Sequence, residues 1–207
     1  MTRIFPALIA SFLLVSTVSA DVFFTGDTTG GPTFARPTSF TTTGSAGFAD
    51  FVRYQAFQFF TDTTGQYIFE VDGQVANGFT HTDTFALVYN GSFTAGTPLV
   101  NLIAGDDDFA AAFTLLSGTG GNFTSSQIRL GEGTNFGGAA TGLLLTANTT
   151  YVAVIAGFDN PDFGTYRAAI GDGAGGGTVY LGAIPEPTSA LLLAGIGMIG
   201  LVNRRRR

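Results

Sequence analysis

The sequence predicts an all-β protein: an antiparallel, jelly-roll-like β-sandwich between an N-terminal signal peptide and a C-terminal hydrophobic helix. Three observations lead to this class. Apolar residues in the middle of the chain recur with a period of two, the period of a strand, and not with the 3.6 of a helix. Turn-forming residues separate these segments at a spacing of roughly ten residues. Uncharged apolar runs stand near both ends of the chain.

The first 20 residues have the layout of a secretory signal peptide. Arg3 supplies a positive start, residues 4–15 are mostly apolar, and small residues end the segment at Ala20. The alternative is an N-terminal anchor that is never cut. Because the apolar run is shorter than the about 20 residues that a membrane span needs, the pattern favours cleavage before Asp21.

Residues 21–170 are expected to form the sandwich. Segments rich in aromatic and β-branched residues alternate with polar ones, which is typical of strands. Residues 151–156 are apolar on both faces, which favours a central strand. Residues 21–47, rich in Thr, Gly and Pro, are expected to form a loose edge strand or a partly ordered arm. Strands are predicted over residues 51–60, 66–72, 84–89, 99–104, 126–130, 151–156, 165–170 and 178–181.

Glycine marks the connections and the end of the sandwich. Asn77-Gly78 and Asn90-Gly91 are dipeptides that favour positive φ in tight turns. Residues 171–184 begin with five glycines among seven residues. This composition is typical of a flexible linker.

Charge and composition narrow the function classes. Between Asp21 and Pro187, four arginines stand against fifteen acids, so the net charge of this part is −11. Nucleic acid is therefore not expected as a partner, because its phosphates are bound through clustered basic residues. The chain has no cysteine, so stability has to come from packing, for which 21 phenylalanines and six tyrosines supply large apolar area.

Asp106, Asp107 and Asp108 form the sharpest polar cluster. Three adjacent carboxylates repel one another, and a hard cation such as calcium would relieve that repulsion. Asp83 begins a neighbouring predicted strand and could join them. The alternative is a solvated acidic loop, since the spacing matches no EF-hand loop. The sequence therefore indicates these four residues as a candidate calcium site, and it leaves the solvated acidic loop open as the alternative.

No residue pattern indicates catalysis. His81 is the only histidine, so a zinc site built from several Cys or His ligands is not expected. No G-x-S-x-G elbow accompanies it, and its position between two threonines predicts a solvated loop side chain. We expect no catalytic residues and no enzyme activity. Six loop phenylalanines could contact sugars or cap the ends of the core: Phe93, Phe109, Phe123, Phe136, Phe158 and Phe163.

The C-terminal 23 residues combine a short motif, an apolar run and a basic end. Pro185-Glu186-Pro187 precedes an uncharged segment over residues 190–202, and Arg204, Arg205, Arg206 and Arg207 end the chain. Arginines at the end of an apolar span stay on the cytoplasmic side of a membrane. The body would then lie outside, with the motif at the outer face. Thirteen apolar residues are at the lower edge of spanning length, which leaves both transient and permanent anchoring open.

This three-part order resembles the PEP-CTERM sorting signal of Gram-negative bacteria that make exopolysaccharide. The resemblance implies processing by exosortase, a membrane-embedded transpeptidase, near Pro185-Glu186-Pro187. It implies a precursor held in the inner membrane by residues 190–202 and then delivered to the cell surface or the extracellular space. It covers about 23 of the 207 residues and says little about the body.

The body resembles the pre-peptidase C-terminal type of β-sandwich, whose members are usually non-catalytic accessories on secreted proteins. No enzyme domain accompanies it here. Calcium binding in some relatives could be carried over only to Asp83 and Asp106–Asp108. The resemblance rests on five segments that follow one another in the order of that family: residues 64–71, 83–89, 103–107, 145–151 and 163–166.

Together these features predict an exported, non-catalytic protein of the cell surface or biofilm matrix. A structural or adhesive role within exopolysaccharide is the expected function. The alternative is a secreted module that binds carbohydrate or calcium. In either case exosortase, the inner membrane and matrix polysaccharide are the expected partners.

Overall fold

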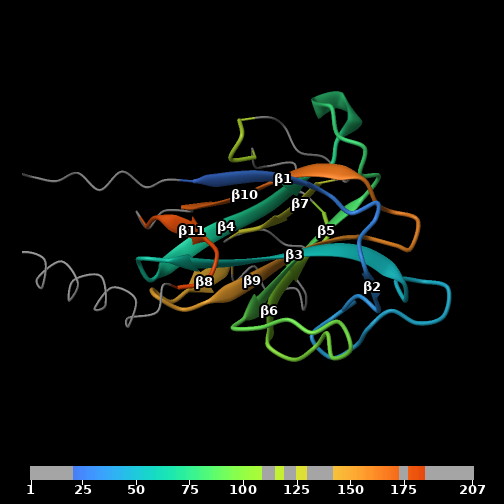
Figure 1. Cartoon of the computed structure of the whole chain (residues 1–207), viewed down its shortest axis with the longest axis horizontal. Helices are drawn as coiled ribbons and strands as arrows, with labels where there is room; N and C mark the ends of the chain where they lie inside the picture. Colours follow the sequence, from blue (N-terminus) through green and yellow to red (C-terminus); the bar gives the residue numbers. More distant parts are fainter. Residues whose placement is uncertain (1–20, 109–114, 119–124, 130–141, 173–176, 185–207) are drawn as a thin grey trace, which may run out of the picture.

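The chain folds into two antiparallel sheets that pack face to face (Figure 1). A computed structural model describes residues 21–108, 115–118, 125–129, 142–172 and 177–184. The predicted signal peptide (1–20) and the predicted tag with its span (185–207) lie outside the described residues. Within the described ranges, no helix has the length and apolar character needed to cross a membrane.

Sheet 1 has the strand order β1-β10-β4-β7, and β8 pairs with β4 beside β7. Every neighbouring pair is antiparallel. Its strands are β1 (Val22–Asp27), β4 (Gly65–Asp72), β7 (Ser125–Ile128), β8 (Leu143–Leu145) and β10 (Thr165–Asp172).

Sheet 2 has the strand order β11-β3-β9-β5-β6, and β2 pairs with the beginning of β3. These pairs are also antiparallel. Its strands are β2 (Thr33–Phe34), β3 (Val52–Thr61), β5 (Thr84–Asn90), β6 (Leu102–Asp106), β9 (Tyr151–Gly157) and β11 (Val179–Leu181). A 3₁₀ turn, η1 (Val75–Asn77), ends at Gly78 with φ of 88°.

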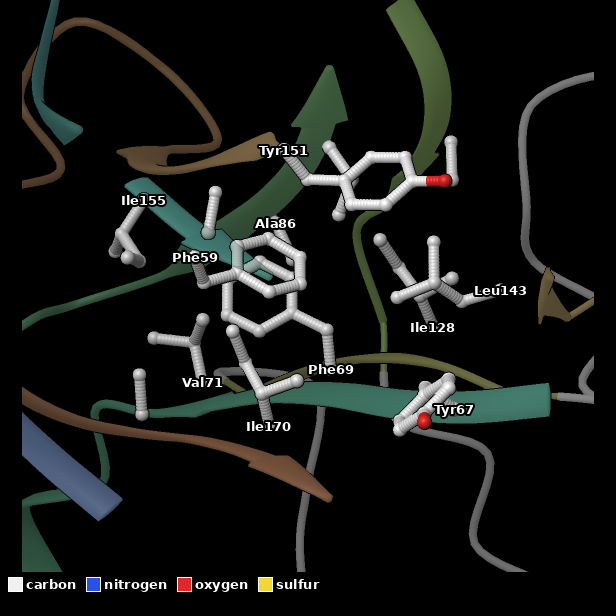
Figure 2. Packing of buried hydrophobic residues seen from close by; sticks show 14 of the residues in the cluster. Phe59, Tyr67, Phe69, Val71, Ala86, Ile128, Leu143, Tyr151, Ile155 and Ile170 are labelled. Atoms are coloured by element: carbon white, nitrogen blue, oxygen red, sulfur yellow. The ribbon is translucent and has the colours of Figure 1, made fainter. Parts of the chain in front are cut away.

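The main core lies between the sheets. Figure 2 shows Phe59, Tyr151 and Ile155 of sheet 2 facing Phe69 and Ile170 of sheet 1. Successive residues of a strand point to opposite faces, so alternate positions of each strand supply this core. Burial of so many large side chains stabilises a chain that has no disulfides.

A second apolar cluster covers the outer face of sheet 2. Val152, Val154 and Ala156 of β9 point away from the main core and contact side chains from the N-terminal arm and the loop after β5. Phe34 of the arm and Ala49, which follows the arm before β3, belong to this cluster. Residues 21–47 were expected to form a loose edge strand or a partly ordered arm; they form edge strand β1 and a packed cover of sheet 2. Strand β9 is therefore buried on both faces, as its continuous apolar sequence predicted.

Most predicted strands are confirmed within one or two residues. The strand predicted over 99–104 is shifted, because residues 98–101 form a turn in which Asn101 has a φ of 65°. β6 begins only after this left-handed residue. β8 was not predicted, whereas β1 and β2 lie in residues 21–47, for which a loose edge strand or a partly ordered arm was expected.

The glycine-rich segment after β10 contains ordered strand at both ends. β10 continues through Gly171 and Asp172, which pair with Ile68 and Tyr67 of β4. β11 then pairs with β3, after residues 173–176, which lie outside the described part. Residues 171–172 and 179–181 therefore belong to the two sheets, and the C-terminal strand is part of the sandwich.

Candidate functional site at one end of sheet 2

Acidic residues from three segments meet at one end of sheet 2. Asp83 immediately precedes β5, and Asp107 and Asp108 immediately follow β6. The antiparallel register places Thr84 opposite Gly157 and Ala86 opposite Asp106, so the start of β5 and the ends of β6 and β9 lie together. The loop after β9 adds Asp159 and Asp162. We call these five residues the acidic cluster.

Arg36 from the N-terminal arm is the basic partner of the acidic cluster. Its side chain is only 2% exposed. Its Nε and Nη2 donate to the carbonyl oxygen of Phe158 at 3.0 and 2.7 Å, and its Nη1 donates to the carbonyl of Pro37. The guanidinium carbon lies 3.8 Å from the centre of the Phe85 ring, a cation–π contact that partly replaces lost hydration.

Burial and like charges shift the pKa values in the cluster. Burial lowers the pKa of Arg36 to about 10, against the attraction of Asp107, Asp159, Asp83 and Asp162, so the group stays charged at neutral pH. Burial, followed by repulsion from Asp107, raises the pKa of Asp83 to about 7. Burial and the neighbouring Asp108 raise the pKa of Asp107 to about 7.

The loop after β9 is held by its own carboxylates. Asp159 accepts hydrogen bonds from the backbone N–H groups of Ala49 and Asn160 at 2.8 and 2.7 Å. Asp162 accepts from the Thr82 hydroxyl at 2.7 Å and from the Asp159 N–H at 2.9 Å. Sequence reasoning missed Asp159 and Asp162, although their place between β9 and β10 could have indicated them.

Of the four carboxylates predicted to bind calcium, Asp83, Asp107 and Asp108 lie in the acidic cluster, and Asp106 is separated from them. Asp106 is the last residue of β6 and is fully buried; its Oδ2 accepts a hydrogen bond from the Gln127 N–H of sheet 1 at 3.2 Å. Asp107 is attracted by the charge of Arg36, which belongs to the N-terminal arm that covers the outer face of sheet 2. Successive residues of an extended segment point to opposite faces. Among the described residues, no group of three or more His, Cys, Asp or Glu is arranged to hold a metal ion.

The chemistry available to the acidic cluster is proton binding near neutral pH. The Oδ1 atoms of Asp83 and Asp107 are buried and have no hydrogen-bond partner among the described residues. A protonated carboxyl tolerates such a site better than a carboxylate, because burial disfavours the charged form. The buried charge of Arg36 compensates part of the remaining negative charge.

His81 is buried and not solvated as predicted. Its side chain is 1% exposed, and neither ring nitrogen has a hydrogen-bond partner among the described residues. The ring meets Tyr166 edge-on at a centroid distance of 6.4 Å. Burial lowers the pKa of His81 to about 4, so it is neutral at physiological pH.

The described loop phenylalanines pack against the protein. Phe93 and Phe158 lie against the outer apolar cluster, and the ring of Phe163 lies 4.2 Å from the guanidinium carbon of Arg53. Phe109, Phe123 and Phe136 lie outside the described residues. The loop phenylalanines were predicted either to contact sugars or to cap the core. The packing of Phe93 and Phe158 against the outer apolar cluster agrees with the capping role.

Comparison with protein families finds a match at the C-terminus. Residues 183–207 match the PEP-CTERM protein-sorting motif. The match includes the predicted motif, apolar run and arginines, and it begins two residues after β11 ends. Such a motif indicates an exported protein that is anchored in the membrane and processed by exosortase. No curated protein matches the chain.

Proposed function

We propose that this chain is an exported, non-catalytic protein that is released or transferred at its C-terminal tag and then serves a structural or adhesive role in an exopolysaccharide matrix. The observation that carries the proposal is the sorting motif over residues 183–207, directly behind the last strand of an antiparallel sandwich. The final location is the cell surface or the extracellular matrix.

The spacing between fold and tag supports processing while the body is folded. Leu181 is the last strand residue, and Pro185 follows four positions later. At no more than about 3.6 Å per residue, the first residue of the motif is within about 14 Å of the end of β11 and the last within about 22 Å. A membrane enzyme that acts at Pro185-Glu186-Pro187 therefore works close to the surface of the sandwich.

The body is proposed to be a jelly-roll-like sandwich of the pre-peptidase C-terminal type. Of the five segments that carry this resemblance, residues 64–71, 83–89 and 103–107 include most of β4, β5 and β6. Accessory domains of this type are usually non-catalytic. The buried, neutral His81, with no hydrogen bond to either ring nitrogen among the described residues, supports a non-catalytic assignment.

The export route is tested by mutating the motif in the full-length chain. A variant with Pro185→Ala and Glu186→Ala is compared with the wild type by cell fractionation and by the mass of the recovered protein. We expect the wild type to reach the surface or medium with a shortened C-terminus, and the variant to stay in the inner membrane at the mass of the unprocessed precursor.

Asn203→Ala is the matched control, because it changes the tail but keeps the motif, the apolar run and the arginines. It is expected to behave like the wild type. A double variant that still reaches the surface with the wild-type mass would contradict the proposed route. Hydrolase activity of the purified protein that is lost in a folded His81→Ala variant would contradict the non-catalytic assignment.

The matrix role is tested separately in cells that lack the protein. Complementation with the wild-type chain is expected to restore retention of exopolysaccharide on the cells, whereas the Pro185→Ala, Glu186→Ala variant is not. Equal retention in all three strains would contradict a structural or adhesive role without affecting the export route.

A further inference from the structure

We propose that the outer face of sheet 2 binds a neutral polysaccharide chain in a groove beside β11. The inference rests on the proposed matrix role and names the class of ligand and its site. It comes from three observations on the described residues: an open groove, a pair of stacked aromatic rings next to it of which Tyr180 is exposed, and a lining without charge.

The groove lies between β3, β9 and the loop after β5. It measures about 230 Å³ and is lined by Ala56, Gln58, Ser92, Phe93 and Val152. Gln58 and Val152 are directly opposite each other in the pairing of β3 with β9. They form the floor, while Ser92 and Phe93 belong to the loop that follows β5 and form a wall.

An aromatic pair continues the floor toward the edge of the sheet. Phe60 lies two positions after Gln58, so both side chains are on the same face of β3. Tyr180 of β11 is opposite Phe60, and the two rings stack at a centroid distance of 4.9 Å with an interplanar angle of 12°. Tyr180 remains 43% exposed, so aromatic surface is offered to solvent beside the groove.

This combination of groups suits a sugar. A sugar ring has faces of C–H groups, which pack on aromatic rings, and hydroxyl groups, which need donors and acceptors. The amide of Gln58 offers two donors and one acceptor, and the hydroxyl of Ser92 offers both functions. Binding sites for small ligands are mainly apolar with a few polar groups of this kind.

The size and openness of the groove favour a chain and not an enclosed small molecule. Sites that enclose a drug-sized ligand have volumes of about 300–1,000 Å³, whereas this groove holds about 230 Å³. It can therefore accept one ring while neighbouring units extend over Phe60 and Tyr180. A polymer that contacts several positions gains affinity that a single unit cannot.

Charge selects a neutral polymer over an acidic one. None of the five lining residues carries a charge, and the part of the chain between Asp21 and Pro187 has a net charge of −11. Such a field repels polyanions such as uronate-rich polysaccharides. A neutral glycan carries no charge and is not repelled by this field.

The wall of the groove is held in place by contacts within the loop. Asn101 Nδ2 donates to the carbonyl and hydroxyl oxygens of Ser92 at 3.3 and 3.2 Å. Tyr89 Oη donates to the Pro98 carbonyl at 2.9 Å, and the Phe93 ring packs against Tyr89 at 4.8 Å. Preorganisation of this kind lowers the entropic cost of binding.

The test uses the full-length chain in a detergent whose head group contains no sugar. Isothermal titration is performed with neutral oligosaccharides (hexamers of β-1,4-glucan, α-1,6-glucan and β-1,4-galactan) and with an acidic alginate hexamer. We expect at least one neutral hexamer to bind and alginate not to bind. Tyr180→Ala and Gln58→Ala are each expected to weaken binding by about tenfold or more, while Tyr180→Phe keeps the ring and stays within about threefold of the wild type.

Leu144→Ala is the matched control, because Leu144 is 64% exposed on β8 of the other sheet. It is expected to bind like the wild type. The proposal is overturned if no neutral hexamer binds, if alginate binds more tightly than the neutral hexamers, or if Tyr180→Ala and Gln58→Ala both bind like the wild type. Each of these results can occur while sorting and surface location hold, so it is distinct from a failure of the proposed function.

Discussion

Arg36 shows how a single residue organises the end of sheet 2. Arginine is rarely buried without a partner, and here the guanidinium is held by two backbone carbonyls and the ring of Phe85. Its charge is opposed by a set of carboxylates, among which Asp83 and Asp107 have pKa values raised to about 7. The site therefore carries more negative charge than one arginine balances.

At the residue scale, we predict that Asp107→Asn stabilises the protein at pH 8 more than at pH 5. The pKa of Asp107 is raised from 3.8 to about 7, mainly by burial. Between these two pKa values the folded state binds more protons than the unfolded state. The contribution of Asp107 to the free energy of unfolding therefore falls as the pH rises from about 4 to 7. Asparagine does not ionise, so the variant does not lose this part of its stability as the pH rises. Urea denaturation of both proteins at pH 5 and pH 8 measures the difference.

Asp62→Asn provides a control of opposite sign. A hydrogen bond from the Thr178 N–H lowers the pKa of Asp62, so its carboxylate favours folding above its unfolded pKa, and the substitution should bring no gain at pH 8. His81, whose pKa is lowered to about 4, makes the wild type less stable as pH falls from 6.5 to 4. This effect is common to all three proteins and cancels in the comparison. An Asp107→Asn gain that is equal at pH 5 and pH 8 would contradict the prediction.

At the element scale, strand alternation accounts for what the sequence could predict. Strands β3, β4, β5, β9 and β10 were found because aromatic and β-branched residues alternate or run continuously within them. β8 is three leucines long, too short to show a period, and β2 has only two residues. In the segment before β3, β1 has only six residues, alternately half-buried and exposed. Most of the remaining segment covers the outer face of sheet 2 without pairing as a strand, so it carries no clear period of two.

The same alternation explains why the predicted calcium set is divided. Asp83 and Asp107 were expected to come together, and the register between β5 and β6 brings them to one end of the sheet. Asp106 is still part of β6, so its side chain takes the face opposite to that of Asp107. A run of three carboxylates in sequence therefore does not imply three carboxylates in one site when the run continues a strand.

A prediction at this scale concerns the turn that leads into β10. Gly164 has a φ of 151°, and an added Cβ would lie 2.6 Å from the backbone of Thr80. The backbone of Gly164 is held because the Thr28 N–H donates to its carbonyl and its own N–H donates to the Thr28 hydroxyl. The backbone of Thr80 is held because its N–H donates to the carbonyl of Thr165. We expect Gly164→Ala to lower the free energy of unfolding by about 2–4 kcal/mol, as measured by urea denaturation.

Gly30→Ala is the matched control for that substitution. An added Cβ at Gly30 meets no atom within 4 Å, so the change in the free energy of unfolding should stay within about 0.5 kcal/mol. If Gly164→Ala changed the free energy of unfolding as little as Gly30→Ala, the proposed close contact between the backbones of Gly164 and Thr80 would be contradicted.

At the scale of the whole molecule, two apolar clusters and one late strand hold the sandwich together. The main core joins the sheets, and the outer cluster fixes the N-terminal arm and the loop after β5 to sheet 2. β11 closes the free edge of β3 next to the sorting motif. The last strand of the fold, β11, therefore follows the glycine-rich segment in the sequence.

This arrangement predicts that β11 stabilises the body although it is only three residues long. Two chains that begin at Asp21 are compared, one ending at Ile184 and one ending at Asp172. The shorter chain loses the buried Val179, worth about 1.5–3 kcal/mol, and the stacking of Tyr180 on Phe60, worth about 0.5–1.5 kcal/mol. Its free energy of unfolding should therefore be lower by about 2–4.5 kcal/mol in urea titrations. Because the uncovered edge of β3 can pair with another chain, the shorter chain should also self-associate in size-exclusion chromatography. Equal stability and equal elution of the two chains would mean that β11 is an appendage of the tag and not a strand of the sandwich.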